Sequence, residues 1–332
     1  VVTPSADFDL AVSDIVRSAY GHAGQKCSAA SMLILVGSVG RSQRFRRQLL
    51  DAIETLRVGF PDDPKAVMGP AIEPPGAKLR AGLTELGSGE RWVLEPQPLD
   101  SNERLWTPGL REGVKLGSNF QKTEYFGPIL GIATVRTIDE ALALQNSTVF
   151  GLTAGIHSLD ADEVSYWLDR VQAGNCYVNR GITGAVVQRQ PFGGWKKSSV
   201  GPGWKAGGPN YLFGLGSWRT SKAKARVKNV RQDSAVGTFY DSIALQSKEH
   251  AEAFLRSMAS DSEAWEKIYG VSHDYANLTS ERNLLRYRPT PVQVRVSRFV
   301  PMSDALRVVL AGLRVGGRVS LSVTDPLPDQ IV

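Results

Sequence analysis

The residue best suited to chemistry in this sequence is Cys27, which lies in the polar stretch GHAGQKCSAAS at residues 21–31. A cysteine acts as a nucleophile through its thiolate, and it then needs partial exposure and nearby positive potential. Its neighbours Gly24, Lys26 and Ser28 are small or polar. Free cysteine is more often buried among apolar side chains. The local sequence therefore leaves two interpretations open, a nucleophile held on a loop or a structural thiol.

Two further stretches suit a flat ligand and its polar groups. TEYFGPIL, residues 123–130, places Glu124 and Phe126 before a Gly-Pro turn and an apolar run. A carboxylate there could accept hydrogen bonds from ribose hydroxyls, and an aromatic side chain could lie against a ring. PFGGWKKSSVGPGWKAGGPNYL, residues 191–212, is rich in glycine but lacks phosphate-loop spacing, so we expect its backbone amides to approach a substrate. Each stretch alone is also typical of a strand entry or a surface loop.

Alternating helices and strands must position these stretches. Residues 8–20 have apolar side chains at helical spacing and end at Gly21, and residues 32–37 form a short apolar run typical of a buried strand. The same patterns predict helices at 42–56, 137–147, 160–172, 248–260, 262–270 and 302–317, and strands at 129–136, 153–158, 173–181, 292–300 and 318–323. This alternation predicts an α/β architecture with a smaller second α/β unit at the C-terminal end.

Composition excludes several classes of protein. The chain has 332 residues, of which 42% are hydrophobic and 22% charged, and no apolar run is long enough for an integral membrane span. Its two cysteines are too few for a disulfide framework, and its four histidines lack metal-ligand spacing. We therefore expect reduced thiols, a cytoplasmic protein and no metal. The N-terminus VVTPSADFDL is no signal peptide; it begins like the end of a strand and indicates a piece of a larger protein.

Much of the positive charge lies in one segment. The formal net charge is +6, and residues 218–234, WRTSKAKARVKNVRQDS, carry six basic side chains. Such a run could bind nucleic acid. It has no interleaved aromatic residues and no helical apolar stripe, so we favour a solvated linker and expect no nucleic-acid partner.

Three motifs in register resemble a known family. GQKCSA, EYFGPIL and PFGGWKKS, in this order and at these separations, resemble the catalytic half of an aldehyde dehydrogenase over residues 1 to about 217. IVRSAYGHAGQKCSAAS and NRGITGAVVQRQPFGG are most similar to the branch that oxidises L-glutamate γ-semialdehyde, also called Δ1-pyrroline-5-carboxylate dehydrogenase. LTSERNLLRYRPTPVQVRV, residues 278–296, resembles the C-terminal region of the longer, bifunctional proline utilization A proteins.

The resemblance implies a fold and four parts. The fold would be an α/β aldehyde dehydrogenase catalytic domain plus a smaller α/β C-terminal accessory domain. The parts would be the end of an NAD-binding domain at 1–20, the catalytic domain at 21–217, a basic linker at 218–240 and a truncated accessory domain at 241–332.

The resemblance also assigns catalytic and cofactor roles. Cys27 would attack the aldehyde carbon and form a thiohemiacetal that passes a hydride to NAD, leaving a thioester for hydrolysis. Its backbone N–H would be one donor to the oxyanion. Glu124 would bind the nicotinamide ribose, and Phe126 would lie beside the nicotinamide. Lys26 could lower the pKa of the thiol or point into solvent.

Substrate binding is implied for four more residues. Ser28 and the backbone N–H groups of Gly184 and Ala185 would anchor the α-carboxylate of the substrate, because hydrogen bonds to an anion are stronger than neutral ones. Phe192 would pack on its methylene stem. Cys176, in an apolar strand pattern, is expected to be an inert core thiol.

Some parts of such an enzyme would lie before Val1. These are the NAD-binding domain, the general-base Glu of an E-x-G-G-K type motif and an FAD-dependent proline dehydrogenase module. We therefore expect this chain, alone, to bind NAD only in part and not to turn over a small-molecule aldehyde. We also expect a homo-oligomer. Two alternatives stay open: an aldehyde dehydrogenase for another substrate and, for 241–332, a non-catalytic lid or assembly module.

Overall fold

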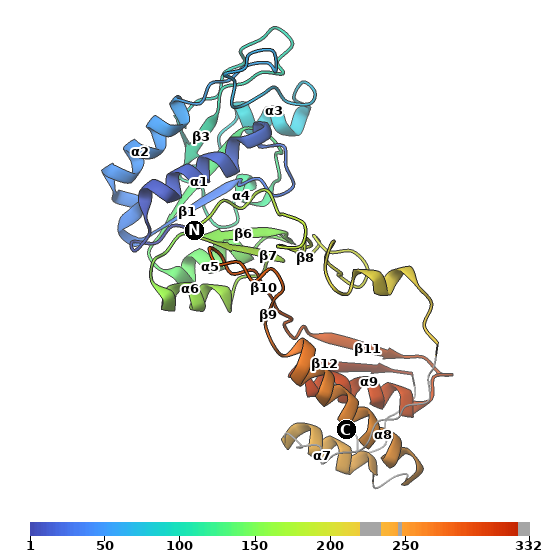
Figure 1. Cartoon of the computed structure of the whole chain (residues 1–332). Coiled ribbons are helices and arrows are strands. Elements are labelled where there is room, and N and C mark those ends of the chain that lie inside the picture. The colour runs from blue at the N-terminus through green and yellow to red at the C-terminus, as the bar shows by residue number, and fades with distance from the viewer. Residues whose placement is uncertain (220–233, 245–247, 325–332) are drawn as a thin grey trace. The chain divides into compact units, whose positions relative to one another are not determined.

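The computed structural model describes residues 1–219, 234–244 and 248–324, and the chain divides into two compact units, Val1–Leu215 and Gly216–Val332 (Figure 1). Most of the expected basic linker, residues 220–233, lies outside the described residues. Residues 234–240, which we expected to belong to that linker, form the first turns of helix α7 instead. Each unit is described separately below.

The first unit is built on a four-stranded sheet. Its order is β1-β4-β3-β2, with β1 at Met32–Val36, β4 at Ile129–Val135, β3 at Gly109–Glu112 and β2 at Arg91–Leu94. The first three strands are parallel, and β2 is antiparallel to β3. The sequence predicted β1 and β4, which are mostly apolar. It missed β2 and β3, which are short and carry charged residues.

A second sheet continues the first through the start of the chain. It consists of β6 at Thr153–Ile156 and β7 at Asn175–Val178, which run parallel. Val2 lies between the two sheets: its N–H donates to Ile34 O at 2.9 Å, and its carbonyl accepts from Val36 N at 3.0 Å. On its other side Thr3 N donates to His157 O at 3.1 Å. The chain thus begins in an extended segment, as expected, and that segment joins the sheets edge to edge.

Helices cover both faces of the larger sheet. Helix α1, Phe8–Tyr20, and helix α2, Gln43–Glu54, lie on one face, and α5, Ile138–Asn146, packs on the other through Ala141 and Leu144. Their N-caps are Asp7, Ser42 and Thr137, each of which accepts backbone N–H hydrogen bonds from the first turn. The three helices confirm the periodicity argument. Helix α6, Ala161–Leu168, is shorter than expected.

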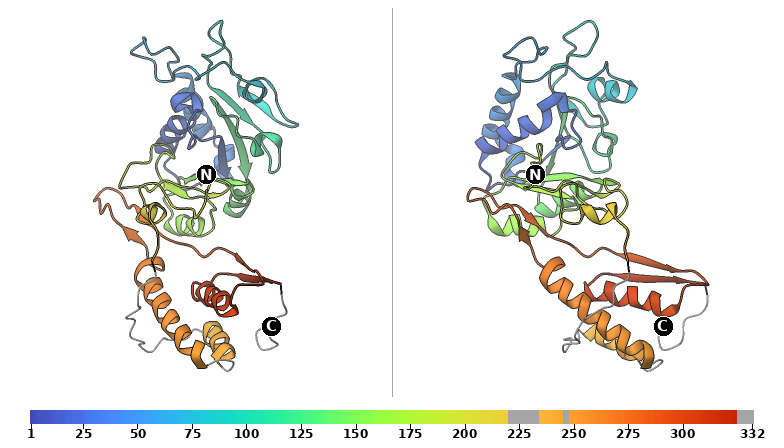
Figure 2. Two further views of the ribbon diagram at one scale, coloured as in Figure 1. Left: turned by 90° about the vertical axis from the view of Figure 1, so that its right-hand side faces the viewer. Right: turned by 45° about the vertical axis from the view of Figure 1, so that its right-hand side comes forward.

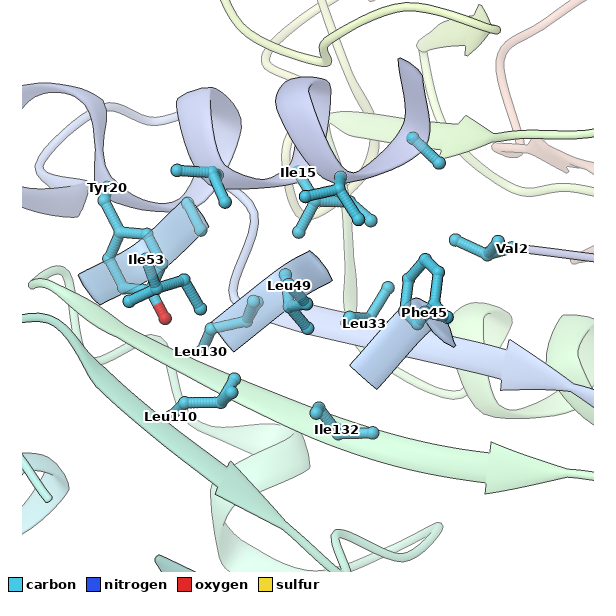
Figure 3. Close-up of a cluster of buried hydrophobic side chains, with 14 of the residues drawn as sticks. Val2, Ile15, Tyr20, Leu33, Phe45, Leu49, Ile53, Leu110, Leu130 and Ile132 are labelled. Atoms are coloured by element: carbon cyan, nitrogen blue, oxygen red, sulfur yellow. The ribbon is translucent and has the colours of Figure 1, made fainter. Parts of the chain in front are cut away.

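Figure 3 shows the core between α1, α2 and the sheet. Ile15 and Tyr20 come from α1, and Leu49 from α2; they meet Leu33 and Leu130 from the strands. Tyr20 and Leu33 are no more than 2% exposed. Burying each such side chain contributes about 1.5–3 kcal/mol, so this core fixes α1 firmly, and α1 leads directly into the loop of Cys27.

The remaining elements of the first unit are short. They are α3 at Ala77–Thr84, α4 at Asn119–Lys122, β5 at Phe150–Gly151, β8 at Trp195–Lys196 and the 3-10 turns Gly21–Gly24, Gly37–Arg41 and Tyr211–Leu215. β5 and β8 pair antiparallel. Figure 2 shows that long stretches between these elements are loops.

The second unit contains the expected strand–helix–strand arrangement. β11, Val292–Val296, pairs parallel with β12, Val319–Val323, and α9, Met302–Arg314, crosses between them and lies against both (Figure 2). Helices α7, Ser234–Ala244, and α8, Lys248–Ala264, pack on α9 through Tyr240, Phe254 and Leu310. A π-helical turn, Trp265–Tyr269, and a small antiparallel pair, β9 at His273–Asp274 and β10 at Leu284–Leu285, complete it.

Two properties of the described residues bear on function. Within them, no helix is both long and apolar enough to cross a bilayer. No group of three or more His, Cys, Asp or Glu side chains in the same part of the chain is placed to hold a metal ion.

Candidate active site

Cys27 lies on a tight loop at the C-terminal end of α1. The loop begins with a 3-10 turn in which His22 and Ala23 have φ angles of 54° and 53°. These left-handed conformations cost energy for residues other than glycine, so surrounding contacts must hold them. A second turn follows, closed by Ala29 N donating to Lys26 O at 3.0 Å. The Cys27 thiol at this turn is exposed, which favours the nucleophile over the structural thiol.

Two contacts fix the base of this loop. The buried Tyr20 hydroxyl donates to Gly109 O at 2.9 Å and ties the end of α1 to β3. Ala30 N donates to Ser18 O at 2.9 Å and ties the exit of the loop to the same helix. The loop therefore starts and finishes on α1, and its backbone is fixed on both sides of Cys27.

The loop of Cys27 contacts the loop of Phe126. Gly24 has a φ of +67°, and a Cβ placed on it would overlap the carbonyl oxygen of Gly127 and lie 2.6 Å from its carbonyl carbon. The Gln25 side chain bridges two segments: its Nε2 donates to Phe126 O at 3.2 Å, and its Oε1 accepts from Ile72 N at 2.8 Å. The fold thus brings the first two of the three motifs together.

Glu124 and Phe126 lie on either side of a buried tyrosine. Tyr125 stacks on Phe120, with ring centroids 5.1 Å apart. Glu124 is exposed and Phe126 is 37% exposed. Phe126 has a φ of 60°, so the chain turns there. A carboxylate and an aromatic ring are therefore both accessible within three residues, suited to part of a nucleotide.

The expected carboxylate anchor is attached to α1 at two points. Ser28 follows Cys27 and is buried. The loop that carries Gly184 and Ala185 begins where Ile182 N donates to Ser18 Oγ at 3.0 Å. Gly184 has a φ of +78° with open space around it. The structure therefore fixes both parts of the anchor to the same helix.

Backbone donors are free where the proposed chemistry needs them. Throughout the described part of the chain, no group accepts a hydrogen bond from the N–H of Cys27, Gly184 or Ala185. A free N–H on the nucleophile itself suits an oxyanion that forms on the attacked carbon. Two free N–H groups in succession suit a carboxylate.

Phe192 belongs to a loop that is hydrogen-bonded to β7 and to the later segment around Ala206. Phe192 pairs with Ala206 through two backbone hydrogen bonds of 3.0 and 2.9 Å. The next residue, Gly193, donates its N–H to Asn175 Oδ1 at 3.1 Å. Phe192 itself is half-buried. Its backbone is therefore positioned by β7, which sequence reasoning did not foresee.

The second cysteine differs from the expectation of a core thiol. Cys176 lies on β7, but it is only half-buried, and its Sγ donates to Ala173 O at 3.5 Å. It lies on the same short strand as Asn175, so it is close to the edge of the sheet. Gln25 and Asn175 are the residues of this site that the sequence missed. Both act through backbone contacts to distant segments, which local sequence does not reveal.

Comparison with known proteins gives three findings on the first unit. The model of the aldehyde dehydrogenase family matches residues 1–217. The chain is 35% identical to 1-pyrroline-5-carboxylate dehydrogenase of Bacillus subtilis over 214 residues, which are 64% of this chain and 41% of that protein. It is 36% identical to a 1-pyrroline-5-carboxylate dehydrogenase from Thermus with bound NAD, with a TM-score of 0.57 over 64% of this chain and 40% of that one.

One solved structure resembles both units. Proline utilization A from Corynebacterium freiburgense is 47% identical, with a TM-score of 0.87, and the match covers 98% of this chain and 32% of that chain. The chain spans about two fifths of the length of the curated relatives it matches. These matches confirm the expected fold class and the suspected branch.

Proposed function

Because this chain belongs to the aldehyde dehydrogenase family, we propose that it carries the catalytic part of an enzyme that oxidises L-glutamate γ-semialdehyde to L-glutamate. Its relatives include proteins named 1-pyrroline-5-carboxylate dehydrogenase. Opening of the 1-pyrroline-5-carboxylate ring by water gives this semialdehyde. Another aldehyde dehydrogenase with a different substrate is the alternative.

The observation that carries the proposal is the surroundings of Cys27. Its thiol is exposed, its loop is held on both sides by α1, and its own N–H is free. A thiolate that attacks an aldehyde carbon forms a C–S bond and moves the carbonyl electron pair onto oxygen. The N–H of Cys27 is suited to donate to that oxyanion. The product of this step is a thiohemiacetal on Cys27.

The later steps convert the aldehyde carbon to a carboxylate. The thiohemiacetal carbon gives up its hydrogen as a hydride, which NAD accepts when bound. The carbon is then a thioester on Cys27, and water adds to it and displaces the thiol. Glu124 and Phe126 suit part of such a nucleotide, because an exposed carboxylate and a partly exposed aromatic ring lie two residues apart. We propose that Glu124 holds the ribose and Phe126 lies beside the nicotinamide.

Substrate selection is proposed to rest on four groups. The Ser28 hydroxyl and the free N–H groups of Gly184 and Ala185 would bind the α-carboxylate. The ring of Phe192 would pack against the methylene stem. This set favours a semialdehyde that carries a carboxylate over a simple alkyl aldehyde.

An activated ester tests the covalent step on this chain without a nucleotide. 4-Nitrophenyl acetate should acylate Cys27 in a stoichiometric burst of nitrophenolate. The burst should vanish in Cys27→Ser and persist in Cys176→Ser, and L-glutamate should slow it by occupying the anchor. A burst that survives Cys27→Ser, or one that L-glutamate does not slow, would contradict the proposal.

Turnover is a separate question. The proposed nucleophile and anchor come from this chain, whereas the general base and most of the NAD site of the family would come from a preceding segment. We therefore expect no sustained NADH formation from this chain with L-glutamate γ-semialdehyde and NAD. A clear steady rise in NADH absorbance would show that this division of the site is wrong.

For residues 241–332 we propose a non-catalytic accessory role. The segment contains no cysteine, and the described part is a strand–helix–strand unit covered by two helices. Deleting it should leave the Cys27 burst unchanged. We further propose a homo-oligomeric, cytoplasmic protein, and a bifunctional parent with an FAD-dependent proline dehydrogenase module; the match to proline utilization A supports the parent.

A further inference from the structure

Lys205 is a half-buried lysine that the proposed reaction does not use. It lies in the glycine-rich stretch, and its Nζ donates to Gly174 O at 2.6 Å, to Gly193 O at 2.6 Å and to Asn175 Oδ1 at 3.2 Å. Within the described ranges, no carboxylate forms an ion pair with it. An ammonium held only by neutral oxygen atoms is unusual, because buried charge is normally paired.

These acceptors belong to two segments that approach closely. A Cβ placed on Gly174 would overlap the carbonyl oxygen of Gly193, so the two backbones are in contact. The side chain of Asn175 completes the junction: its Oδ1 accepts from Gly193 N at 3.1 Å, and its Nδ2 donates to Pro191 O at 3.1 Å. Two carbonyl groups that face each other repel, and an ammonium between them turns this repulsion into attraction.

The hydrogen bonds of this junction hold the residues on both sides of Phe192. Pro191 and Gly193 on either side of it are bound by Asn175, and Gly193 is also bound by Lys205. Phe192 itself pairs with Ala206, the residue that follows Lys205. The backbone at Phe192 is thus positioned by the hydrogen bonds of Pro191, of Gly193 and of Phe192 itself to other segments.

We propose that Lys205 is a positioning residue of the substrate site: with Asn175 it clamps the backbone of Pro191–Gly193 onto β7 and thereby sets the Phe192 ring. This inference rests on the proposed function, which assigns Phe192 to the methylene stem of the substrate. Lys205 acts through Phe192 and does not touch the reacting atoms.

The charge state of Lys205 should make the strength of this clamp depend on pH. Burial lowers the pKa of Lys205 to about 8, and Cys176 on β7 is the titratable group that faces it. The ammonium has three N–H donors for its three acceptors, whereas the neutral amine has two. Above pH 8 one acceptor therefore loses its donor, and the 191–193 segment should loosen.

Hydrogen–deuterium exchange of this chain tests the clamp without any ligand. In Lys205→Met the amides of Phe192 and Gly193 should exchange about tenfold faster or more, as expected for loss of a charged hydrogen bond. Lys205→Arg should largely restore protection. Lys196→Met is the matched control, because Lys196 Nζ also donates to two backbone carbonyls, Asn146 O at 2.5 Å and Thr148 O at 3.0 Å, but holds no part of 191–193.

The pH dependence keeps the test informative if Lys205→Met does not fold. In the unmodified chain, protection at Phe192 and Gly193, corrected for intrinsic exchange, should fall as the pH rises through about 8. Absence of this step would overturn the clamp. Equal deprotection in Lys205→Met and Lys196→Met would overturn it as well.

A second measurement connects the clamp to the substrate. L-glutamate should protect Cys27 from 4-nitrophenyl acetate in the unmodified chain, and Lys205→Met should need about tenfold more L-glutamate for the same protection. Equal protection in both would overturn the positioning role. No protection in either, with the exchange result as expected, would refute the proposed function and leave the clamp standing.

Discussion

Replacing Gly24 with alanine should separate the loop of Cys27 from the loop of Phe126. Two independent costs apply. Gly24 has a φ of +67°, and a residue with a Cβ in that region costs about 1–2 kcal/mol. The new Cβ would also overlap Gly127 O, which is main chain and cannot rotate away. Overpacking of this kind costs about 1–3 kcal/mol more.

One contribution to the free energy of unfolding favours the alanine variant. Alanine restricts the unfolded chain, which stabilises a protein by about 0.4–1 kcal/mol. The net loss for Gly24→Ala should therefore be about 1–5 kcal/mol. Gly184→Ala, at a φ of +78° with open space around it, has only the strain cost and should lose up to about 1.5 kcal/mol. Gly21→Ala, with a negative φ and open space, should be neutral or slightly stabilising.

Equilibrium urea unfolding of these three variants gives the free energies, and the rate of iodoacetamide alkylation of Cys27 reports the position of its loop. We expect the order of stability Gly21→Ala, Gly184→Ala, Gly24→Ala, and an altered alkylation rate only in the last when compared with Gly21→Ala. If Gly24→Ala is no less stable than Gly184→Ala, the close approach to Gly127 is absent and the assembly of the site described above is refuted.

Three further predictions each concern one side chain. Glu90→Gln should lower the free energy of unfolding by about 3–5 kcal/mol. Its partner Arg111 lies 2.9 Å away, and both side chains are 2% exposed, so Arg111 would lose its counter-charge. Glu140→Gln, at a more exposed ion pair, is the control and should cost under about 1 kcal/mol in the same urea assay. Burial lowers the pKa of His157 to about 4, so the unfolded chain takes up this proton first as the pH falls. Stability should then drop by up to about 3 kcal/mol between pH 6.5 and about 4, and His157→Gln should flatten this part of the urea-derived profile. Gln25→Met removes two contacts to backbone and should cost about 1–3 kcal/mol, with faster amide exchange at Ile72; unchanged exchange there would contradict the bridge.

The sequence predicted those elements whose signals are local. Helices α1, α2 and α5 have apolar side chains at helical spacing and capping residues at their N-termini, and both kinds of signal lie within the element itself. β2 and β3 escaped prediction because Arg91, Arg111 and Glu112 interrupt their apolar pattern and because they exist through pairing with partner strands. Their length is not the reason, since β6 and β7 are also four residues long and were predicted.

The candidate site also depends on contacts between segments that are distant in the sequence. Cys27, Glu124 and Phe126 stand out locally by residue type, but only the resemblance groups them into one site, since nothing local links GQKCSA to EYFGPIL. The link is physical and lies far along the chain: Gln25 binds Phe126 O across 101 residues, and Gly24 packs on Gly127. A glycine and a glutamine in a polar loop carry no sign of such partners, so only the folded chain identifies them as the residues that assemble the site.

The two cysteines show what distinguishes a candidate nucleophile from a thiol that only packs. Exposure alone separates them weakly, because Cys176 is half-buried rather than enclosed. The difference lies in the groups around the sulfur. Cys176 lies on a strand, and its Sγ already donates to Ala173 O. Cys27 lies at a turn where its backbone N–H is free, so a thiolate that attacked a carbonyl carbon from this position would have a donor for the oxygen that becomes negative. The turn offers this combination because no ladder engages its N–H groups, and the left-handed His22 and Ala23 lead the chain directly into it.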